Sequence, residues 1–403
     1  MFSNITGQDN VVRLLKNDII KKSLNNSMIF HGEKGNGKLT AALEFTRAIN
    51  CRQTGETTCQ CQNCIRIRNL DFEGLIFLSR RDFFYYLFEY LEAYKKEKNP
   101  FFYEKIKKIV NLVFLPLQSF LIKDIFSESD KKSLFESSEA LQNILSKQEI
   151  ASSDGETILK SVKKVNDLYK KPGIPINMLR EALNWTYISQ PDINRVVIID
   201  RADLLEHSSR NVLLKRLEEP SPNLFFILIA ENKNRIIQTI KSRCRPYFFN
   251  NLKKDAVMKI IQNNFKEGAV YASVAEFLER SDENSKANIY PLVVKLLNLV
   301  FLKEHKFNEL SLFLNTFSDR KKVRSLLLNL SLTIEKELLE RGTGGDAEPD
   351  IKALRNIGNL ELENLNKILK DRINKIDVFY LTPALTLEGI FYPLKAMVLN
   401  GEI

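Results

Sequence analysis

The chain has 403 residues, of which 44% are hydrophobic and 27% charged, a composition that excludes global disorder and favours two or three domains. The net charge of +10 favours a polyanionic partner such as nucleic acid, although a lysine-rich proteome gives the same figure. There is no signal-like N-terminus and no run of about 20 apolar residues, so we expect a cytoplasmic protein without membrane contact.

The first elements follow the order helix, strand, glycine loop, helix. VVRLLKNDIIKKSL (11–24) has apolar residues at helical spacing, with Thr6 or Asn10 as its expected cap. The apolar run SMIF (27–30) predicts a strand that leads into GEKGNGKLT, and helical spacing resumes in AALEFTRAINC (41–51). This is the arrangement in which a phosphate-binding loop works.

The loop itself carries only part of the usual chemistry. Its glycines allow the backbone to wrap around an anion: Gly32, Gly35 and Gly37. Lys38 is expected to reach the outer phosphates, but Leu39 stands where Ser or Thr normally binds magnesium, and Thr40 points elsewhere on the helix. Binding of ATP or ADP stays open, because backbone amides hold phosphate without any catalytic side chain.

Four of the five cysteines crowd into one short segment, 51–64: Cys51, Cys59, Cys61 and Cys64. Four thiolates are the ligand set of a structural zinc site, which would stabilise the loop after the first α/β helix. The C-x-C spacing of Cys59 and Cys61 is tighter than usual, so four free thiols are the alternative.

A segment of about 79–172 interrupts the α/β pattern and is expected to be an inserted helical lobe. It is rich in aromatic residues, leucine and lysine. Aromatic residues interleaved with lysines suit the binding of single-stranded nucleic acid, but amphipathic helices that bury one face have the same pattern. The core interpretation is favoured.

The α/β pattern returns in RVVIID (195–200) and LFFILIA (224–230), two apolar runs that predict buried parallel strands of a doubly wound sheet. Asp200 ends the first run at the position of a magnesium-binding aspartate, but Arg201 replaces the acidic residue that activates water. Ala230 stands where a polar residue would help to orient that water. From about 252 onward the pattern is helical, with a break at 341–350.

In this order the motifs resemble the AAA+ subunits of the bacterial DNA polymerase III clamp loader, and the delta-prime type most closely. The residues that carry the resemblance are ITGQDNVV, SMIFHGEKGNGK, the four cysteines, VVIIDRADLL, NVLLKRLEEPSPN, TIKSRC and, near the end, NKIDVFYLTPALTLEG. The inserted lobe lies outside the resemblance.

The resemblance implies a fold, a domain order and partners. The fold is an α/β AAA+ P-loop domain (1–250) followed by a helical lid (251–298) and a helical collar (299–403). The expected partners are the gamma/tau ATPase subunits and the delta subunit, in a hetero-oligomer that loads the sliding clamp onto primed DNA in DNA replication.

The resemblance also assigns a role to Ser242, Arg243 and Cys244. In this family the Ser-Arg-Cys motif projects its arginine into the nucleotide site of a neighbouring ATPase subunit. A guanidinium suits this role because it stays charged and meets phosphate oxygens with a planar fork. The subunit is therefore expected to supply an arginine finger without turning over ATP itself.

Two other functions are compatible with the residues. A gamma/tau-type ATPase subunit is favoured by Lys38 and Asp200 but opposed by Leu39 and Arg201. A zinc-stabilised module that binds single-stranded DNA outside any clamp loader is the second alternative.

Overall fold

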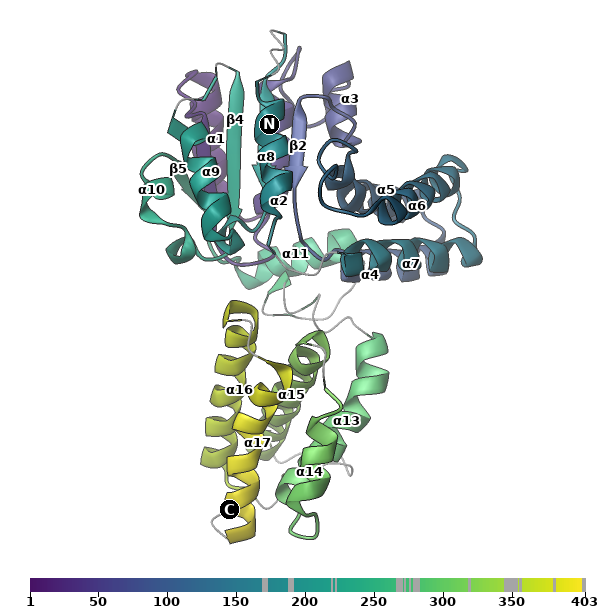
Figure 1. The fold of residues 1–403 in the computed structure, drawn as a ribbon, viewed down its shortest axis with the longest axis vertical. Coiled ribbons are helices and arrows are strands. Elements are labelled where there is room, and N and C mark those ends of the chain that lie inside the picture. Colours follow the sequence, from purple (N-terminus) through teal and green to yellow (C-terminus); the bar gives the residue numbers. More distant parts are fainter. Residues whose placement is uncertain are drawn as a thin grey trace. The chain divides into compact units, whose positions relative to one another are not determined.

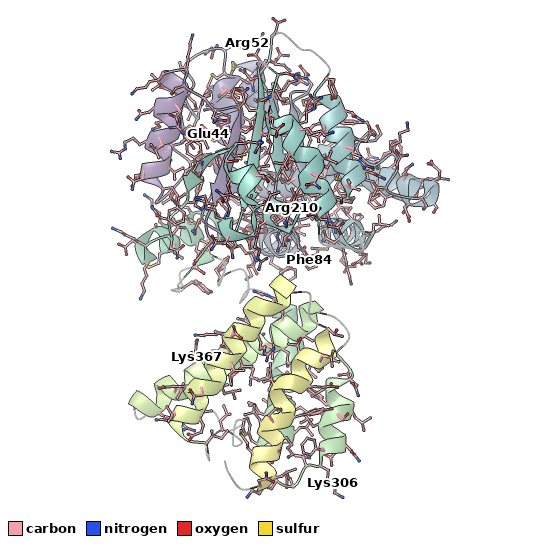
Figure 2. All side chains as sticks on the ribbon, turned by 60° about the vertical axis from the view of Figure 1, so that its left-hand side comes forward. Glu44, Arg52, Phe84, Arg210, Lys306 and Lys367 are labelled. Atoms are coloured by element: carbon pink, nitrogen blue, oxygen red, sulfur yellow. The ribbon has the colours of Figure 1, made fainter. Side chains whose placement is uncertain are left out.

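The computed structural model consists of two compact units, Met1–Leu278 and Glu279–Ile403, which we describe separately. Side chains fill the interior of each unit (Figure 2). The structure describes residues 1–168, 173–187, 192–218, 220–221, 223–265, 271, 273–274, 277, 283–317, 320–343, 354, 357–379 and 382–400.

A five-stranded parallel sheet forms the centre of the first unit, in the order β2-β3-β4-β1-β5 (Figure 1). The strands are β1 (Ser27–His31), β2 (Leu75–Leu78), β3 (Arg195–Ile199), β4 (Leu224–Ala230) and β5 (Arg245–Phe248). Every residue of β2, β3 and β4 is buried, because helices cover both faces of a parallel sheet. The carboxyl ends of all strands meet at one edge.

The predicted strands at 27–30, 195–200 and 224–230 are confirmed, and β2 and β5 complete the sheet. Outside the inserted lobe, the described α-helices of this unit are α1 (Asp9–Ile20), α2 (Lys38–Ile49), α3 (Gln62–Arg68), α8 (Ile176–Trp185), α9 (His207–Glu218), α10 (Gln238–Lys241) and α11 (Lys254–Phe265). The expected cap of the first helix was wrong. The N-cap residue of α1 is Gln8, and it makes no side-chain capping bond.

The inserted segment forms a helical lobe beside β2, on the side of the sheet away from β5 (Figure 1). Its helices are α4 (Phe84–Glu97), α5 (Pro100–Phe114), α6 (Glu128–Ser146) and α7 (Ser152–Leu168). Many of its aromatic side chains belong to the same apolar core as the sheet: Phe83, Tyr90, Tyr94, Phe102 and Tyr103. For these residues the core interpretation is confirmed.

The second unit is helical, as the pattern after 252 predicts. It contains α13 (Glu283–Phe301), α14 (Phe307–Leu314), α15 (Arg320–Thr343), α16 (Asn359–Phe379) and α17 (Pro383–Asn400). It has its own core of leucines, valines and phenylalanines, with Leu314, Leu330 and Leu362 fully buried. Residues 344–350 of the expected break lie outside the described residues. Among the described helices, none is long and apolar enough to cross a membrane.

Candidate nucleotide site and cysteine cluster

The glycine loop joins β1 to α2 at the carboxyl edge of the sheet. Gly35 and Gly37 have φ values of 88° and 87°, in the left-handed region that side chains rarely enter. A Cβ at Gly32 would lie 2.2 Å from the carbonyl oxygen of Phe249, the residue that follows β5. The glycines therefore meet steric needs of the fold as well as of a phosphate loop.

Lys38 folds back onto its own loop. Its Nζ donates to the carbonyl oxygens of Gly32 and Glu33, both at 2.6 Å, and the side chain is 4% exposed. Burial, and then the nearby charge of Arg81, lower the pKa of Lys38 to about 8. The residues beside it offer little to a metal: Leu39 packs against the apolar core and Thr40 is exposed.

Asp200 follows β3 at the same edge and is fully buried. Arg81, which follows β2, donates two charged hydrogen bonds to Asp200: Nε to Oδ2 at 2.8 Å and Nη2 to Oδ1 at 2.7 Å. The Ser79 hydroxyl donates to Oδ2 at 3.0 Å. Burial alone would raise the pKa of Asp200, but the Arg81 charge and these hydrogen bonds lower it below its ordinary value.

Two further carboxylates lie near this pair. The backbone N–H of Glu231, just after β4, donates to Asp203 at 3.4 Å. Burial and the Glu231 charge raise the pKa of Asp203 above its ordinary value. Arg201 has a φ of 54° and its N–H donates to Oδ1 of Asp200, while Ala230 is fully buried at the end of β4. The site thus brings Lys38 and Asp200 to one edge, as the motifs predict.

Arg81 is the site residue that the sequence interpretation missed. It belongs to the segment that was assigned to the lobe. A usable signal exists, because the apolar run LIFL (75–78) is followed at once by SRR, and polar residues after a parallel strand reach the ligand edge.

Arg243 lies elsewhere, between α10 and β5. Its Nη2 donates to Glu218 at the end of α9 at 2.6 Å, and its Nη1 donates to the carbonyl oxygen of Thr239 at 2.8 Å. The Arg243 side chain is 34% exposed and Ser242 is exposed, whereas Cys244 is buried, which raises the pKa of its thiol to about 12. The motif therefore presents a partly exposed guanidinium on an anchored turn.

The sheet separates Arg243 from the glycine loop of its own chain. β5 runs parallel to β1, with Arg245 opposite Met28 and Phe248 opposite His31. Arg243 precedes β5, so it lies near the amino ends of the strands. The glycine loop follows β1 and lies at their carboxyl ends, and the length of the strand between the two ends is about 13 Å. Arg243 is not placed with Lys38 and Asp200.

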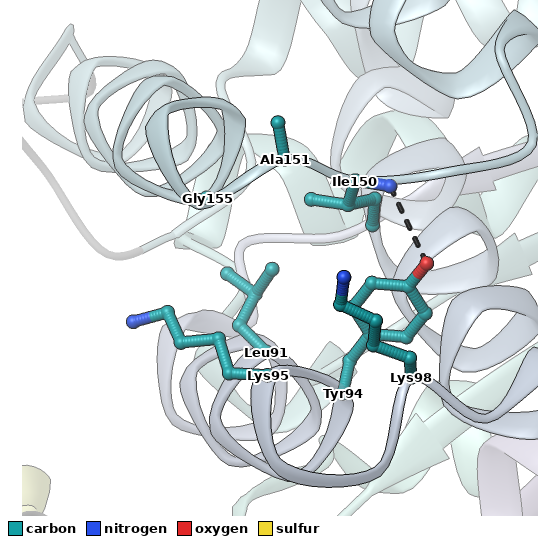
Figure 3. Close-up of a pocket in the computed structure, with 7 residues that line it drawn as sticks. All are labelled: Leu91, Tyr94, Lys95, Lys98, Ile150, Ala151 and Gly155. Carbon is teal, nitrogen blue, oxygen red and sulfur yellow. Dashed lines mark hydrogen bonds between the residues drawn. The ribbon is translucent and has the colours of Figure 1, made fainter.

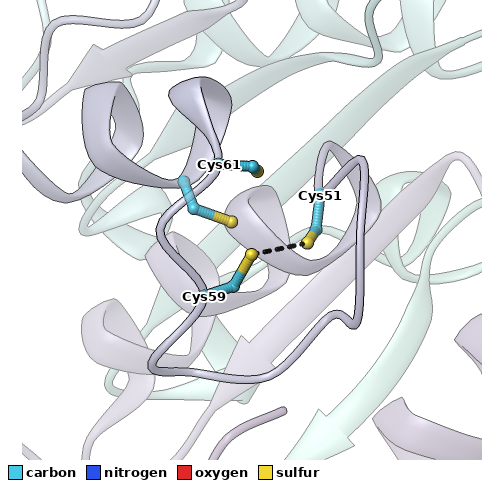
Figure 4. A group of neighbouring side chains, drawn as sticks. Cys51, Cys59 and Cys61 are labelled. Atoms are coloured by element: carbon cyan, nitrogen blue, oxygen red, sulfur yellow. Dashed lines mark hydrogen bonds between the residues drawn. The ribbon is translucent and has the colours of Figure 1, made fainter.

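The four clustered cysteines do come together. Their sulfur atoms all lie within 4.8 Å of one another, and the sulfurs of Cys51 and Cys59 are 3.6 Å apart (Figure 4). Backbone N–H groups of Arg52 and Cys64 outweigh burial and lower the pKa of Cys61 to about 6. Burial raises the pKa of Cys64 to about 12, although Arg47 donates to its sulfur at 3.1 Å.

This geometry fits one tetrahedral metal ion. Four ligands at about 2.3 Å from zinc lie about 3.8 Å apart, close to the spacing of these sulfurs. The cluster is supported from behind by Arg47, which is 1% exposed and pairs with Glu44 through two hydrogen bonds of 2.8 and 2.6 Å. Glu44 in turn accepts from the N–H of Phe2. The four residues can therefore hold a structural ion such as zinc.

A small cavity in the lobe is too small to hold a nucleotide. It lies between α4 and the start of α7, with Lys95, Lys98 and Gly155 in its wall (Figure 3). Its volume is about 50 Å³, well below the roughly 300 Å³ at which ligand pockets begin. The Tyr94 hydroxyl closes one side by accepting from the N–H of Ile150 at 3.4 Å.

The parallel sheet, the glycine loop after β1 and the acidic residue after β3 define an α/β protein of the AAA+ P-loop class with helical additions. A family model described as "DNA polymerase III, delta subunit" matches residues 7–114 and 115–253, more than half of the chain. The chain belongs to this family. The resemblance to clamp-loader subunits is thereby confirmed.

Curated relatives agree with this family. DNA polymerase III subunit delta' of Bacillus subtilis (strain 168) is 22% identical over 84% of this chain and 79% of its own length. Subunit delta' of Haemophilus influenzae is 42% identical over a short stretch, 15% of this chain and 18% of the relative. Subunit tau of Bacillus subtilis (strain 168) is 21% identical over 64% of this chain, which spans only 30% of that relative.

Among solved structures, a DNA polymerase III gamma subunit-related protein from Thermotoga maritima is 18% identical. The match covers 57% of this chain and 81% of that chain, with a TM-score of 0.33.

Proposed function

We propose that this chain is a delta-prime-type clamp-loader subunit that does not hydrolyse ATP and that completes a nucleotide site on a neighbouring subunit. Its partners are the gamma/tau ATPase subunits and the delta subunit, and the complex loads the sliding clamp onto primed DNA in the cytoplasm. The family match and the relatives named delta' and tau support membership of this machine. In this proposal 1–250 is the AAA+ domain, 251–298 the lid and 299–403 the collar.

One observation carries the proposal: Arg243 lies at the edge of the sheet opposite its own glycine loop and is partly exposed. A guanidinium at that place cannot serve phosphates held by Lys38 of the same domain. It suits phosphates that a neighbouring subunit presents, where a fixed positive charge stabilises the transition state of phosphoryl transfer. Glu218 orients it in the free subunit through the 2.6 Å contact.

The missing hydrolysis has three supports in the site. Leu39 offers no oxygen to magnesium, Arg201 offers no base to water, and both oxygens of Asp200 are engaged by Arg81. In the proposed subunit the cysteine cluster holds zinc in a purely structural role, since four protein ligands leave no position for a substrate.

The arginine finger is tested with Arg243→Ala in a loader reconstituted with gamma/tau-type and delta subunits. The variant should assemble normally, but the ATPase site completed by Arg243 should lose about 10³-fold or more in rate, the usual value of an arginine finger. DNA-stimulated ATP hydrolysis is the measurement. Lys241→Ala, a neighbouring surface cation at the end of α10, is the matched control and should change little.

An unchanged rate for Arg243→Ala would overturn the finger. The gamma/tau-type alternative is separated from the proposal by turnover of the chain alone. A rate typical of an ATPase subunit, abolished by Lys38→Ala, would establish that alternative.

A further inference from the structure

All hydrogen-bonding positions of the Asp200 carboxylate are occupied by this chain. An ionised carboxylate has about four acceptor positions on its two oxygens. Oδ1 accepts from Nη2 of Arg81 at 2.7 Å and from the N–H of Arg201 at 3.1 Å. Oδ2 accepts from Nε of Arg81 at 2.8 Å and from the Ser79 hydroxyl at 3.0 Å. No lone pair is left for a metal ion.

The Arg81 charge stands where a metal ion would be needed. Magnesium in nucleotide sites binds one or two carboxylates together with the substrate phosphates. Here the carboxylate at that position is neutralised by a guanidinium, and Glu231 and Asp200 both favour the charged form of Arg81. Arg81 is also close enough to Lys38 to lower the pKa of that ammonium. A divalent ion entering this site would meet two cations.

The segment around Arg81 is held by the lobe. The N–H of Arg81 donates to the Ser79 hydroxyl at 3.0 Å. The next residue, Asp82, accepts from the N–H of Phe84 at 3.0 Å and from the side chain of Asn166 in α7 at 2.9 Å. The guanidinium is therefore bound to the sheet edge through Asp200, and the backbone next to it is held by the last helix of the lobe through Asp82.

We propose that Arg81 is a permanent replacement for the divalent cation at Asp200 and that it excludes metal-bound nucleotides from this site. The proposal rests on the non-hydrolysing function and gives that function a cause beyond Leu39 and Arg201. Arg81 acts as a specificity-determining residue: it makes the site accept, at most, phosphate anions without a metal ion.

The test uses Mn²⁺ with ADP as the probe, in the full chain, with Leu39→Thr as the background so that the other metal ligand is present. Bound Mn²⁺ is measured by electron paramagnetic resonance, and ADP affinity is measured with Mn²⁺ and with a chelator. In Leu39→Thr alone, Mn²⁺ should not strengthen ADP binding. In the double variant Leu39→Thr with Arg81→Gln, Mn²⁺ should strengthen ADP binding about tenfold or more, because the Asp200 carboxylate becomes available to the metal ion.

Two controls locate the effect. Arg80→Gln in the same background removes a neighbouring charge and should not admit Mn²⁺. Adding Asp200→Asn to the double variant should abolish the gain. Thermal melting followed by circular dichroism checks that each variant is folded.

The proposal is overturned if Leu39→Thr binds Mn²⁺ and ADP as tightly as the double variant, or if the folded double variant gains nothing from Mn²⁺. Either result leaves the non-hydrolysing function intact, provided that the unmodified chain does not turn over ATP. Turnover by the unmodified chain would instead refute that function, whatever the Mn²⁺ measurements give.

Discussion

Lys38 shows at the scale of one residue what the altered site costs. Lys38 is 4% exposed, and its ammonium donates to the carbonyl oxygens of Gly32 and Glu33. Burial and the Arg81 charge lower its pKa from 10.5 to about 8. Below pH 8 the lysine is protonated in the folded and unfolded states alike, and the folded state carries the full penalty of the buried charge.

This makes stability depend on pH in a defined direction. Between about pH 8 and pH 10.5 the unfolded chain binds the Lys38 proton and the folded chain has released it, so stability should rise with pH. The rise due to this residue is at most about 3 kcal/mol. The measurement is the free energy of unfolding in urea, for the unmodified chain and for Lys38→Met, across this pH range. The difference between the two chains removes the contribution of other titrating groups. A difference that does not change with pH would contradict the assigned pKa.

At the scale of elements, the cysteine segment 51–64 comprises the loop between α2 and α3 together with the first residues of α3, and the loop has little apolar core of its own. A bound ion would hold it, because metal binding to a preformed set of thiolates adds directly to folding free energy. Glu44 and Arg47 on α2 link the cluster to the helix that begins at Lys38.

Purified under reducing conditions without chelator, the chain should contain one zinc ion, measured by mass spectrometry of metals. Cys61→Ser should lose most of that zinc and lower the melting temperature. Cys244→Ser is the control, because Cys244 is the one cysteine outside the cluster, and it should retain the metal. Absence of zinc from the unmodified chain would remove the structural metal from the proposed function.

The elements differ in how well the sequence alone predicts them. The strands at 27–31, 195–199 and 224–230 could be predicted because each is a continuous apolar run beside a motif. β2 and β5 have four residues each, too short for a distinct period. The cysteine cluster could be predicted from composition, because its four members are near in sequence. SRR after LIFL indicates that polar residues reach the ligand edge, but the pairing of Arg81 with Asp200 could not be predicted, because it depends on the pairing of β2 with β3 across an insertion.

At the scale of the whole molecule, the net charge of +10 and the aromatic lobe suggest a nucleic-acid binder, but the structure limits this. Stacking on bases needs exposed aromatic faces, and Phe83, Tyr90 and Phe102 are buried in the lobe. Phe135 in α6 is exposed, but a single aromatic face offers little stacking, so binding rests mainly on electrostatic attraction to the phosphate backbone.

The isolated chain should therefore bind single-stranded DNA weakly, with a Kd of about 10⁻⁴–10⁻⁶ M. This affinity should fall steeply as the salt concentration rises. It should form a stable complex with gamma/tau-type subunits. Fluorescence anisotropy with labelled oligonucleotides measures DNA binding, and analytical ultracentrifugation of the mixed subunits measures complex formation. Tight, salt-resistant DNA binding together with no complex would favour the separate DNA-binding module.

The glycine loop has a consequence for how such subunits are recognised in genomes. Gly32 is needed because any side chain would collide with the Phe249 carbonyl at 2.2 Å, and Gly37 because its φ of 87° begins α2. Both demands come from the folding of the chain and persist when no nucleotide is ever bound. Natural selection can thus preserve the outline of the motif for the sake of the fold alone, so a pattern search that counts its glycines and lysine is no evidence of ATPase activity.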